Sequence, residues 1–559
     1  MTTRRWHYLV LILMPVVFFL LLDLGLRLAG INPYEKESLS PRLPASAGSL
    51  YEKSVLPDGR EAYVCLAGGT DPRRLQPILT PKPENAFYIF VSGGSAPGGF
   101  PYSGRVAFPQ WLQSGLEAVY PDLSFHVVNA ALPGITINTV AAVVLEMLAY
   151  QPDAVVIYSG NNEQRNLNEG TTVFRNTDVG SRLLRLCWNL RSFQVLHYLI
   201  VGRRPSFDWK FAVAGPENKG APRSADELPY LLEKYTAGLK EIFRITSEAH
   251  VPLVFCTVPV NEKDWPPYVS IHSQPLTEPD QARWMDDLRR AAQRLDSHRP
   301  REAGDICRRL LDQDSRYALA HFLLGKASEQ MGQYEAAREA YQAALDEDGL
   351  RLRACGALNR TLLAFCRSRS IPVADCVSAL RRDAANGLLG FDQFLDNCHP
   401  KPAVHRDLGR EVGRALIQSG ALPPPPEDWP SRFESGLARY ARDMIIADQE
   451  QALACLNTAK ALLEGITFRM DAEAFRRAEE MLALALDADP ALCTGHFYLG
   501  IIHFLAGDPG LARKQWQAEL ESCPRFPDTR IALDLLDSGR LSREMLLQKS
   551  VFNLPVPEP

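Results

Sequence analysis

The feature that most constrains the fold is an alternation of short β-prone runs with segments of helical spacing. Four such runs occupy residues 87–91, 125–128, 154–158 and 253–256. The segments between them, such as 111–120 and 140–150, carry apolar residues at helical spacing. Because strands that alternate with helices form a parallel sheet covered on both faces, this region predicts an α/β fold. Residues 371–374 are expected to add a last short strand, and Pro372 favours an edge position or a strand start.

The start of the chain carries a membrane signal. Arg4 and Arg5 precede an uncharged, mainly apolar run over residues 8–22. Asp23 and Arg27 follow four positions apart, so they share one face of a helix and can pair or snorkel near a membrane interface. With this pair at its edge, the segment is long enough to span a bilayer. We therefore expect an uncleaved N-terminal membrane anchor.

The anchor predicted over residues 1–30 has two alternatives. A cleaved signal peptide needs a small-residue cleavage site, and Leu-Ala-Gly at 28–30 is a poor one. A buried core helix is the second alternative. The basic residues before the apolar run favour a cytoplasmic N-terminus and an exported body. No later segment has comparable apolar length, so we expect a single-pass membrane protein whose body is periplasmic or extracellular.

Shifts in composition divide the rest of the chain. Residues 31–84 are rich in Pro, Ser and Gly with little periodicity, which predicts a linker. The β signal stops between residues 281 and 350, where helical spacing takes over, so the sheet domain is expected in two parts. Four consecutive prolines at 423–426 predict a stiff connector. The predicted units are a sheet domain at 85–280 and 350–420, inserted helices at 281–349, a linker at 421–435 and C-terminal helices at 436–545.

Both helical regions show a 34-residue period. Alanines recur 34 positions apart in each region, as Ala303 with Ala337 and Ala478 with Ala512. In the second region, Gly500 and Trp516 occupy the expected small and large packing positions. The sequence resembles tetratricopeptide repeats over about 295–349 and, more closely, over 470–530. An ordinary amphipathic helical hairpin is the alternative in both regions.

Charge and cysteine content exclude several classes of protein. Lys and Arg total 61 and Asp and Glu total 66, and the net charge of −5 gives no electrostatic case for nucleic-acid binding. The 11 cysteines contain no C-x-x-C pair, so a zinc ribbon or a thioredoxin-like motif is absent. An exported body permits disulfides, but the odd count leaves at least one thiol unpaired or intermolecular.

A loop of small residues follows the first predicted strand. Residues 92–99 read Ser-Gly-Gly-Ser-Ala-Pro-Gly-Gly, and such a turn can present a hydroxyl at the carboxyl end of a sheet. Ser95 is the candidate nucleophile. The loop lacks the spacing of a P-loop, of a dinucleotide-binding motif and of the G-x-S-x-G hydrolase elbow. Taken alone, a plain glycine-rich turn explains it as well.

Two more loops follow the second and third predicted strands. Residues 129–134 end at Gly134, whose backbone N–H is a suitable donor to a developing oxyanion. Residues 159–163 read Ser-Gly-Asn-Asn-Glu, and the side-chain amide of Asn162 is a second neutral donor. Turn formation at Gly134 and an Asx turn at Asn162 are the alternatives.

A fourth block lies far downstream, where Asp396 and His399 are three residues apart. This spacing lets the carboxylate orient the imidazole while the other ring nitrogen faces a serine. Asp392 is less well placed, and a surface Asp/His cap is the alternative. A metal site at His399 with Cys398 and His405 is disfavoured, because adjacent Cys and His side chains do not readily point at one ion. The blocks imply no metal and no cofactor.

The four blocks resemble those of the SGNH hydrolase superfamily, also called GDSL-type esterases and lipases, in this chain order: Ser95, Gly134, Asn162 and Asp396-x-x-His399. The resemblance covers about residues 85–280 and 350–420. It implies a flavodoxin-like three-layer α/β domain, here with an inserted helical repeat and a C-terminal all-α tetratricopeptide-like domain. The sequence departs from the family at Gly94, where the first block usually has an acidic residue.

The resemblance also implies roles for the site residues. Ser95 would attack an ester, His399 would accept its proton and Asp396 would orient His399. The backbone N–H groups of Ser95 and Gly134 would form an oxyanion hole with Asn162. Such a mechanism is chemically coherent, because a neutral histidine can deprotonate a weak serine nucleophile while the donors stabilise the negative oxygen.

The expected function is that of a membrane-anchored, extracytoplasmic serine esterase or acyltransferase. Its substrate would be an ester of a surface glycan or lipid, and the reaction would pass through an acyl-serine intermediate. A protein partner is expected on the helical repeats, the membrane is expected to bind the N-terminal helix, and no nucleic-acid partner is expected. The alternatives are a catalytically inactive SGNH-like scaffold that binds a protein partner through its repeats, and a polysaccharide-binding module.

Overall fold

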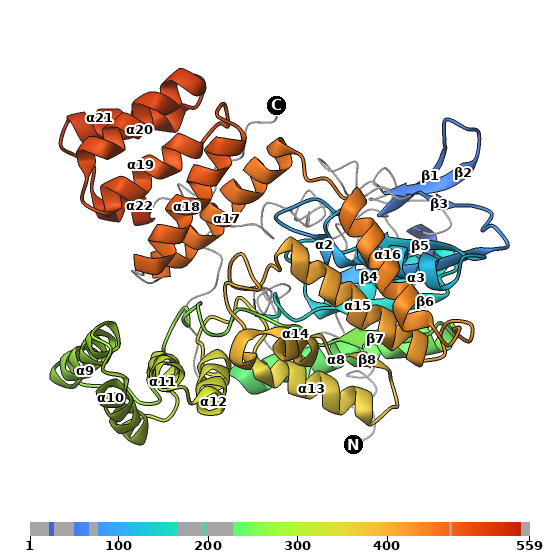
Figure 1. The fold of residues 1–559 in the computed structure, drawn as a ribbon, viewed down its shortest axis with the longest axis horizontal. Helices are drawn as coiled ribbons and strands as arrows, with labels where there is room; N and C mark the ends of the chain where they lie inside the picture. The colour runs from blue at the N-terminus through green and yellow to red at the C-terminus, as the bar shows by residue number, and fades with distance from the viewer. Residues whose placement is uncertain are drawn as a thin grey trace, which may run out of the picture.

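The computed structural model describes residues 22–26, 50–65, 77–164, 192, 195, 227–468 and 472–548. Its centre is a five-stranded parallel sheet with the strand order β5-β4-β6-β7-β8 (Figure 1). The strands are β4 (Ala86–Gly93), β5 (Ser124–Asn129), β6 (Ala154–Tyr158), β7 (Leu253–Cys256) and β8 (Val373–Ala374). The predicted α/β class with a parallel sheet is confirmed. The short strand that contains Val373 lies at the sheet edge, as its preceding proline favours.

Helices cover both faces of this sheet. Every residue of β6 is buried, which is why its sequence is a continuous run of apolar residues. On one face, Phe108 packs on Tyr158, with ring centroids 6.0 Å apart. On the other, Phe365 packs on Phe255 at 6.3 Å. The covering helices are α3 (Phe108–Val119) and α15 (Pro402–Gln418) on the first face, and α4 (Ile137–Met147), α8 (Glu227–Glu248) and α13 (Gly356–Arg367) on the second.

Short helices and turns complete the sheet domain. They are the helices α2 (Ser95–Gly98) and α14 (Cys376–Asp383) and the 3-10 turns η2 (Leu148–Tyr150) and η4 (Ala385–Gly387). The helix α2 begins directly after β4 at the carboxyl edge of the sheet. The loops that follow β5, β6 and β7 reach the same edge, because all five strands run parallel.

A small antiparallel sheet occupies part of the predicted linker. It consists of β1 (Tyr51–Val55), β2 (Glu61–Cys65) and β3 (Ile78–Leu79), in that order. Tyr51 packs edge-to-face on Tyr150, with centroids 5.3 Å apart, and its backbone N–H donates to Glu146 Oε1. The linker predicted over 31–84 is therefore wrong for the described residues of that range. These strands are too short, and bury too few side chains, to produce a visible sequence period.

The predicted Pro-rich linker is also shorter than expected. Helix α16 (Trp429–Asp443) begins within residues 421–435 and packs along α3 rather than joining the C-terminal helices. Its Phe433 ring fills the space beside Gly115 and Gly413, where an added Cβ would approach the ring to 2.4 and 2.3 Å. The linker at 421–435 and the boundary at 436 are thus wrong, because α16 belongs to the core of the sheet domain.

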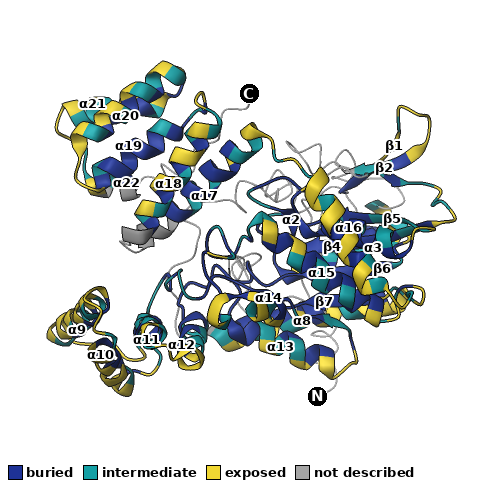
Figure 2. Ribbon diagram, viewed as in Figure 1, coloured by how far each residue is buried: buried dark blue, intermediate teal, exposed yellow. Residues whose placement is uncertain are grey.

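Two helical hairpins form the insert between β7 and α13. Their helices are α9 (Glu278–Asp296), α10 (Pro300–Gln313), α11 (Ala318–Gln330) and α12 (Tyr334–Asp346). The predicted repeat alanines Ala303 and Ala337 are fully buried. Gly325 lies against the Tyr341 ring, where an added Cβ would come within 2.6 Å. Figure 2 shows that α9 and α10 are largely exposed, whereas buried residues dominate around the sheet.

The C-terminal region is helical and repeats the same packing. Its helices are α17 (Asp448–Phe468), α18 (Ala472–Ala488), α19 (Gly495–Leu505), α20 (Pro509–Ser522), α21 (Pro527–Asp537) and α22 (Arg543–Gln548). Gly500 lies against the Trp516 ring as Gly325 lies against the Tyr341 ring. In both pairs the glycine precedes the aromatic residue by 16 positions. Cys493 and Cys523 form a disulfide, with Cα atoms 5.4 Å apart, that ties the start of α19 to the end of α20.

The C-terminal helices pack against loops of the sheet domain. One hydrophobic cluster joins residues of α17–α22 with five loop residues, namely Trp265, Tyr268, Leu350, Leu352 and Phe391. The Arg477 guanidinium lies 3.8 Å from the centroid of the Phe391 ring. Glu450, in the first turn of α17, accepts a hydrogen bond from the Ser103 backbone N–H at 2.9 Å. The C-terminal helices are thus attached to the loops at the carboxyl side of the sheet.

Most of the predicted anchor lies outside the described residues. Of residues 1–30, the structure describes only the short helical stretch 22–26. Within the described part of the chain, no helix combines the length and apolar character needed to cross a membrane. The membrane anchor and its orientation therefore stay predictions.

Candidate active site

Ser95 stands where β4 meets α2, at the carboxyl edge of the sheet. Gly93 ends the strand and Gly94 precedes the serine. An added Cβ at Gly93 would come within 1.9 Å of Tyr158 O, and one at Gly94 within 2.6 Å of Asn162 Nδ2. The turn therefore needs glycine at both positions, since neighbouring groups approach the backbone too closely for any side chain. This contact explains in physical terms why an acidic residue does not fit at Gly94.

The structure brings together three predicted residues from distant parts of the chain. The Ser95 hydroxyl lies 2.7 Å from His399 Nε2. The other ring nitrogen, His399 Nδ1, lies 2.5 Å from an oxygen of the Asp396 carboxylate. An ionised carboxylate only accepts hydrogen bonds, so this contact requires the ring proton on Nδ1. Nε2 is then an acceptor that faces the serine hydroxyl.

The Asp396 carboxylate is buried and ionised. Only 1% of Asp396 is exposed. Its second oxygen accepts the backbone N–H groups of Cys398 and His399, at 2.9 and 2.8 Å. Burial acts to raise the pKa of Asp396, but the His399 ring and these N–H groups outweigh burial, and the pKa lies below its usual value. The carboxylate is therefore held charged beside the imidazole.

A tight loop positions this pair. Phe394 and Pro400 form an isolated antiparallel bridge, and the Leu395 N–H donates to His399 O at 2.9 Å. The Phe100 ring packs on the His399 ring, with centroids 4.7 Å apart. The imidazole is thus fixed by a carboxylate on one side, a serine on the other and an aromatic ring against its face.

A buried layer of polar residues supports the loop, and the sequence patterns did not reveal it. Asn261, just beyond β7, donates its side-chain amide to Asp396 O at 3.1 Å and its backbone N–H to Asn397 O at 3.0 Å. The Arg353 guanidinium donates to the carbonyls of Asn261 and Trp265. Of these residues, only Asn261 could have been found from the sequence, since it is a polar residue that follows a predicted strand.

The predicted oxyanion donors lie in the neighbouring loops. Asn162 is buried beside Gly94, and one amide N–H donates to Ile135 O at 3.3 Å, which leaves the second for a ligand. Gly134 is buried with φ +77°, a backbone conformation that favours glycine. Among the hydrogen bonds of the described residues, none uses the backbone N–H of Ser95 or of Gly134. All three groups stand at the same edge of the sheet as the serine hydroxyl.

The alternative metal site at His399, Cys398 and His405 is not formed. In the described residues, ligand atoms of Asp396, Cys398 and His399 lie within 4.8 Å of one another, but His405 is not among them. His405 is fully buried in α15, and burial lowers the pKa of its ring to about 3. The atoms nearest to one another, on Asp396 and His399, are already joined by a hydrogen bond. The geometry is that of an acid–base pair.

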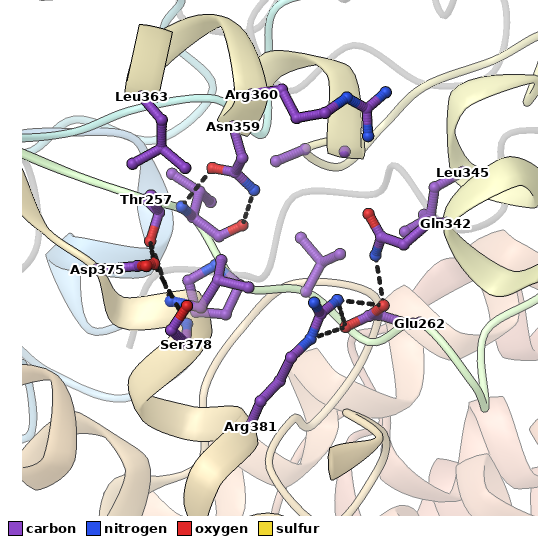
Figure 3. Close-up of a pocket in the computed structure, with 16 residues that line it drawn as sticks. Thr257, Glu262, Gln342, Leu345, Asn359, Arg360, Leu363, Asp375, Ser378 and Arg381 are labelled. Carbon is purple, nitrogen blue, oxygen red and sulfur yellow. Dashed lines mark hydrogen bonds and ion pairs between the residues drawn. The ribbon is translucent and has the colours of Figure 1, made fainter. Parts of the chain in front are cut away.

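A separate cavity opens at the carboxyl ends of β7 and β8. It has a volume of about 280 Å³ and contains none of the three catalytic candidates (Figure 3). Two of its charged groups pair with each other, since Arg381 contacts Glu262 at 2.7 Å. Thr257 likewise donates to Asp375 at 2.8 Å. Since these polar groups satisfy each other, the cavity gives no indication of a ligand.

Comparison with known proteins supports part of the predicted architecture. Residues 318–349 match the tetratricopeptide repeat family. The match covers α11 and α12 in the insert, although the residue pattern predicted the closer resemblance in the C-terminal region. Comparison with curated proteins finds none that matches. Among solved structures, the crystal structure of TesA is 12% identical and aligns over 59% of this chain and 98% of its own, with a TM-score of only 0.25.

Proposed function

We propose that the protein is a serine esterase or acyltransferase of the SGNH type. The observation that carries the proposal is the hydrogen-bonded series from the Ser95 hydroxyl through the His399 ring to the Asp396 carboxylate, at 2.7 and 2.5 Å. A hydroxyl, an imidazole and a buried carboxylate in this order can activate a nucleophile. The order of the four sequence blocks, which resembles that of the SGNH hydrolase superfamily, gives further support.

The reaction begins with attack of Ser95 Oγ on the acyl carbon of an ester. The hydroxyl proton moves to His399 Nε2 as the new C–O bond forms, and Asp396 stabilises the resulting imidazolium. Collapse of the tetrahedral intermediate breaks the ester bond, and His399 returns the proton to the leaving alcohol. Attack by water on the acyl-serine then gives hydrolysis, whereas attack by a sugar hydroxyl gives acyl transfer.

Three N–H donors would stabilise the negative oxygen of the tetrahedral intermediate. They are the backbone N–H groups of Ser95 and Gly134 and the second amide N–H of Asn162. Neutral, preorganised donors are effective because they need no reorganisation as the charge develops. Two observations support this assignment. All three donors lie at the edge of the sheet that carries Ser95, and Asn162 lies against the turn before Ser95.

The proposed setting is an extracytoplasmic surface, with an ester of a surface glycan or lipid as substrate. The apolar run at residues 8–22 supports a membrane anchor. The Cys493–Cys523 disulfide supports an oxidising compartment. A protein partner is proposed for the repeats, since stacked helical hairpins form extended binding surfaces and residues 318–349 match a repeat family.

Turnover and covalent labelling test the proposed activity together. The purified full-length chain is expected to hydrolyse a short-chain aryl ester such as 4-nitrophenyl acetate. A fluorophosphonate should label it stoichiometrically, and mass spectrometry should place the adduct on the peptide that contains Ser95. A folded protein that shows neither turnover nor labelling would contradict the proposal and favour the scaffold alternative.

Replacing Gly94 by alanine is expected to lower kcat by about tenfold. The new Cβ would meet Asn162 Nδ2 at 2.6 Å and push the amide away from the oxyanion. The effect is expected to be smaller than the loss of a whole donor, which costs about 10²–10³-fold. Gly510→Ala on α20 is the matched control, because the nearest atom there is 3.4 Å away. Equal kcat for the two variants would contradict the predicted place of Asn162.

A further inference from the structure

Glu163 is a buried carboxyl group that the proposed mechanism does not use. Only 7% of the residue is exposed. Both carboxylate oxygens lie 3.1 Å from the backbone nitrogen of Ile137, the first residue of α4. One of them also accepts the Ser159 hydroxyl at 3.2 Å. Helix α4 has no acidic residue in its own first turn and no side-chain cap, so Glu163 supplies the negative group that its N-terminus favours.

Two adjacent residues hold the Gly134 turn at two points. Asn162 donates to Ile135 O, one residue after Gly134, and Glu163 accepts the N–H of Ile137, three residues after it. The Gly134 turn is therefore attached to the loop after β6 at Asn162 and at Glu163. The Gly134 N–H and the Asn162 amide, two donors of the proposed oxyanion hole, lie on the two sides of this attachment.

We propose that Glu163 is a positioning residue that keeps these two donors at the separation needed to hold an oxyanion. The inference rests on the proposed function and assigns a role to a residue that does not touch the substrate. Loss of the attachment at Ile137 would let the Gly134 turn move relative to Asn162. Since the donors act mainly in the transition state, the loss would lower kcat and leave KM nearly unchanged.

The surroundings of Glu163 make this role dependent on pH. Burial raises the pKa of Glu163 to about 7, although the N–H of Ile137 and the Ser159 hydroxyl act to lower it. The ionisable group that faces it from α8 is Tyr235, which donates to Ser159 O at 2.9 Å. Burial, with the charge of Glu163, raises the pKa of Tyr235 well above its usual value, so the phenol stays neutral. Glu163 is therefore the group in this contact that changes charge near neutral pH.

Glu163→Gln tests the proposal through the ratio of wild-type to variant kcat. Glutamine has the shape of a protonated glutamic acid, and its neutral oxygen holds the Ile137 N–H more weakly than a carboxylate does. The ratio is therefore expected to be about tenfold at pH 8 and to fall to about one at pH 5. KM for the aryl ester should change less than about twofold. Glu146→Gln is the matched control, because Glu146 also lies in α4 and accepts backbone N–H groups, of Leu50 and Tyr51, away from the serine. A ratio near one at every pH overturns the proposal.

The contribution of Glu163 to the free energy of unfolding must change with pH in the direction opposite to the kcat ratio. The folded-state pKa of about 7 lies above the ordinary value of 4.5, so the folded protein binds the extra proton between these values. The contribution of Glu163 to stability is therefore full below pH 4.5 and is lost as the pH rises through 7. The ratio of wild-type to Glu163→Gln kcat should therefore rise over the pH range in which this contribution to stability declines. A kcat ratio that follows the stability difference instead would assign Glu163 a purely structural role.

A second variant serves if Glu163→Gln does not fold. Ser159→Ala removes a hydrogen bond to the charged form of Glu163, so it should raise the pKa of Glu163 further. The ratio of wild-type to Ser159→Ala kcat, in which pH effects common to both proteins cancel, should therefore rise near pH 7 and return to about one at pH 5. A ratio near one at pH 7 overturns the proposal. Fluorophosphonate labelling of the wild type separates the two hypotheses: no labelling rejects the serine mechanism itself, whereas normal labelling with an unaffected Glu163→Gln rejects only the positioning role.

Discussion

Replacing Ser95 by alanine is expected to lower turnover of an aryl ester by at least about 10³-fold and to abolish labelling by a fluorophosphonate. In the proposed mechanism the Ser95 hydroxyl forms the acyl bond, and His399 Nε2 lies 2.7 Å from it. Without it, the remaining donors can still bind an ester, but no acyl-enzyme can form. The residual rate should therefore lack a burst of released alcohol.

Ser92→Ala is the matched control for this experiment. Ser92 lies three residues earlier, in β4, and its fully buried hydroxyl has no hydrogen-bond partner in the described structure. Loss of an unpaired buried hydroxyl should not reduce stability. Turnover and labelling of this variant are expected to match the wild type. If Ser95→Ala and Ser92→Ala retained equal activity, another residue would have to be the nucleophile.

Replacing Arg353 by methionine is expected to lower the free energy of unfolding by about 2–3 kcal/mol, because it removes a buried guanidinium that donates hydrogen bonds to backbone carbonyls. Arg353 is 2% exposed, and its charge acts on the carboxyl group of Asp348, which is 1% exposed. Burial already raises the pKa of Asp348, although the charge of Arg353 acts to lower it. The substitution also leaves the carbonyls of Asn261 and Trp265 without their donor. Urea unfolding at pH 7 measures the loss.

The same variant should lose activity beyond its loss of stability. Asn261 holds the backbone of Asp396 and Asn397, so a displaced Asn261 would release the loop that carries the imidazole. The kcat is expected to fall even at temperatures where the protein stays folded. Arg360→Met is the control, since Arg360 is exposed and its ion pair with Asp346 contributes at most about 1 kcal/mol. Equal losses of stability and of kcat for the two substitutions would show that Arg353 does not support the active-site loop.

The sequence predicts the parts of this fold that are encoded locally. Strand positions follow from runs such as 154–158, where every residue is buried and apolar, and the candidate site follows from small or polar residues where those runs end. Asp396 and His399 are close in sequence, so their mutual contact is predictable. Their contact with Ser95 depends on the order of parallel strands, which the resemblance to a known family supplied.

The elements that were missed depend on long-range partners. The Phe433 ring fixes the position of α16, because Gly115 and Gly413 leave room for it. No local sequence pattern contains that information. The short strands β1 to β3 bury too few residues to show a period. In the sequence, Glu163 is only the last residue of the motif at 159–163. Its role was not predictable, because its partner, the Ile137 backbone, lies 26 positions away. Local patterns do not encode pairings of this kind.

The distance along the chain between Ser95 and His399 has a consequence for how the protein matures. Their contact joins residues 304 positions apart. At a synthesis rate of about 5–20 residues per second, the serine leaves the ribosome about 15–60 s before its histidine partner. The α17 residue that binds the Ser103 loop is made later still. If Ser95 is the nucleophile, as proposed, the nascent chain carries it without its activating base until His399 has been made, so esterase activity is expected to appear only after synthesis has passed residue 399.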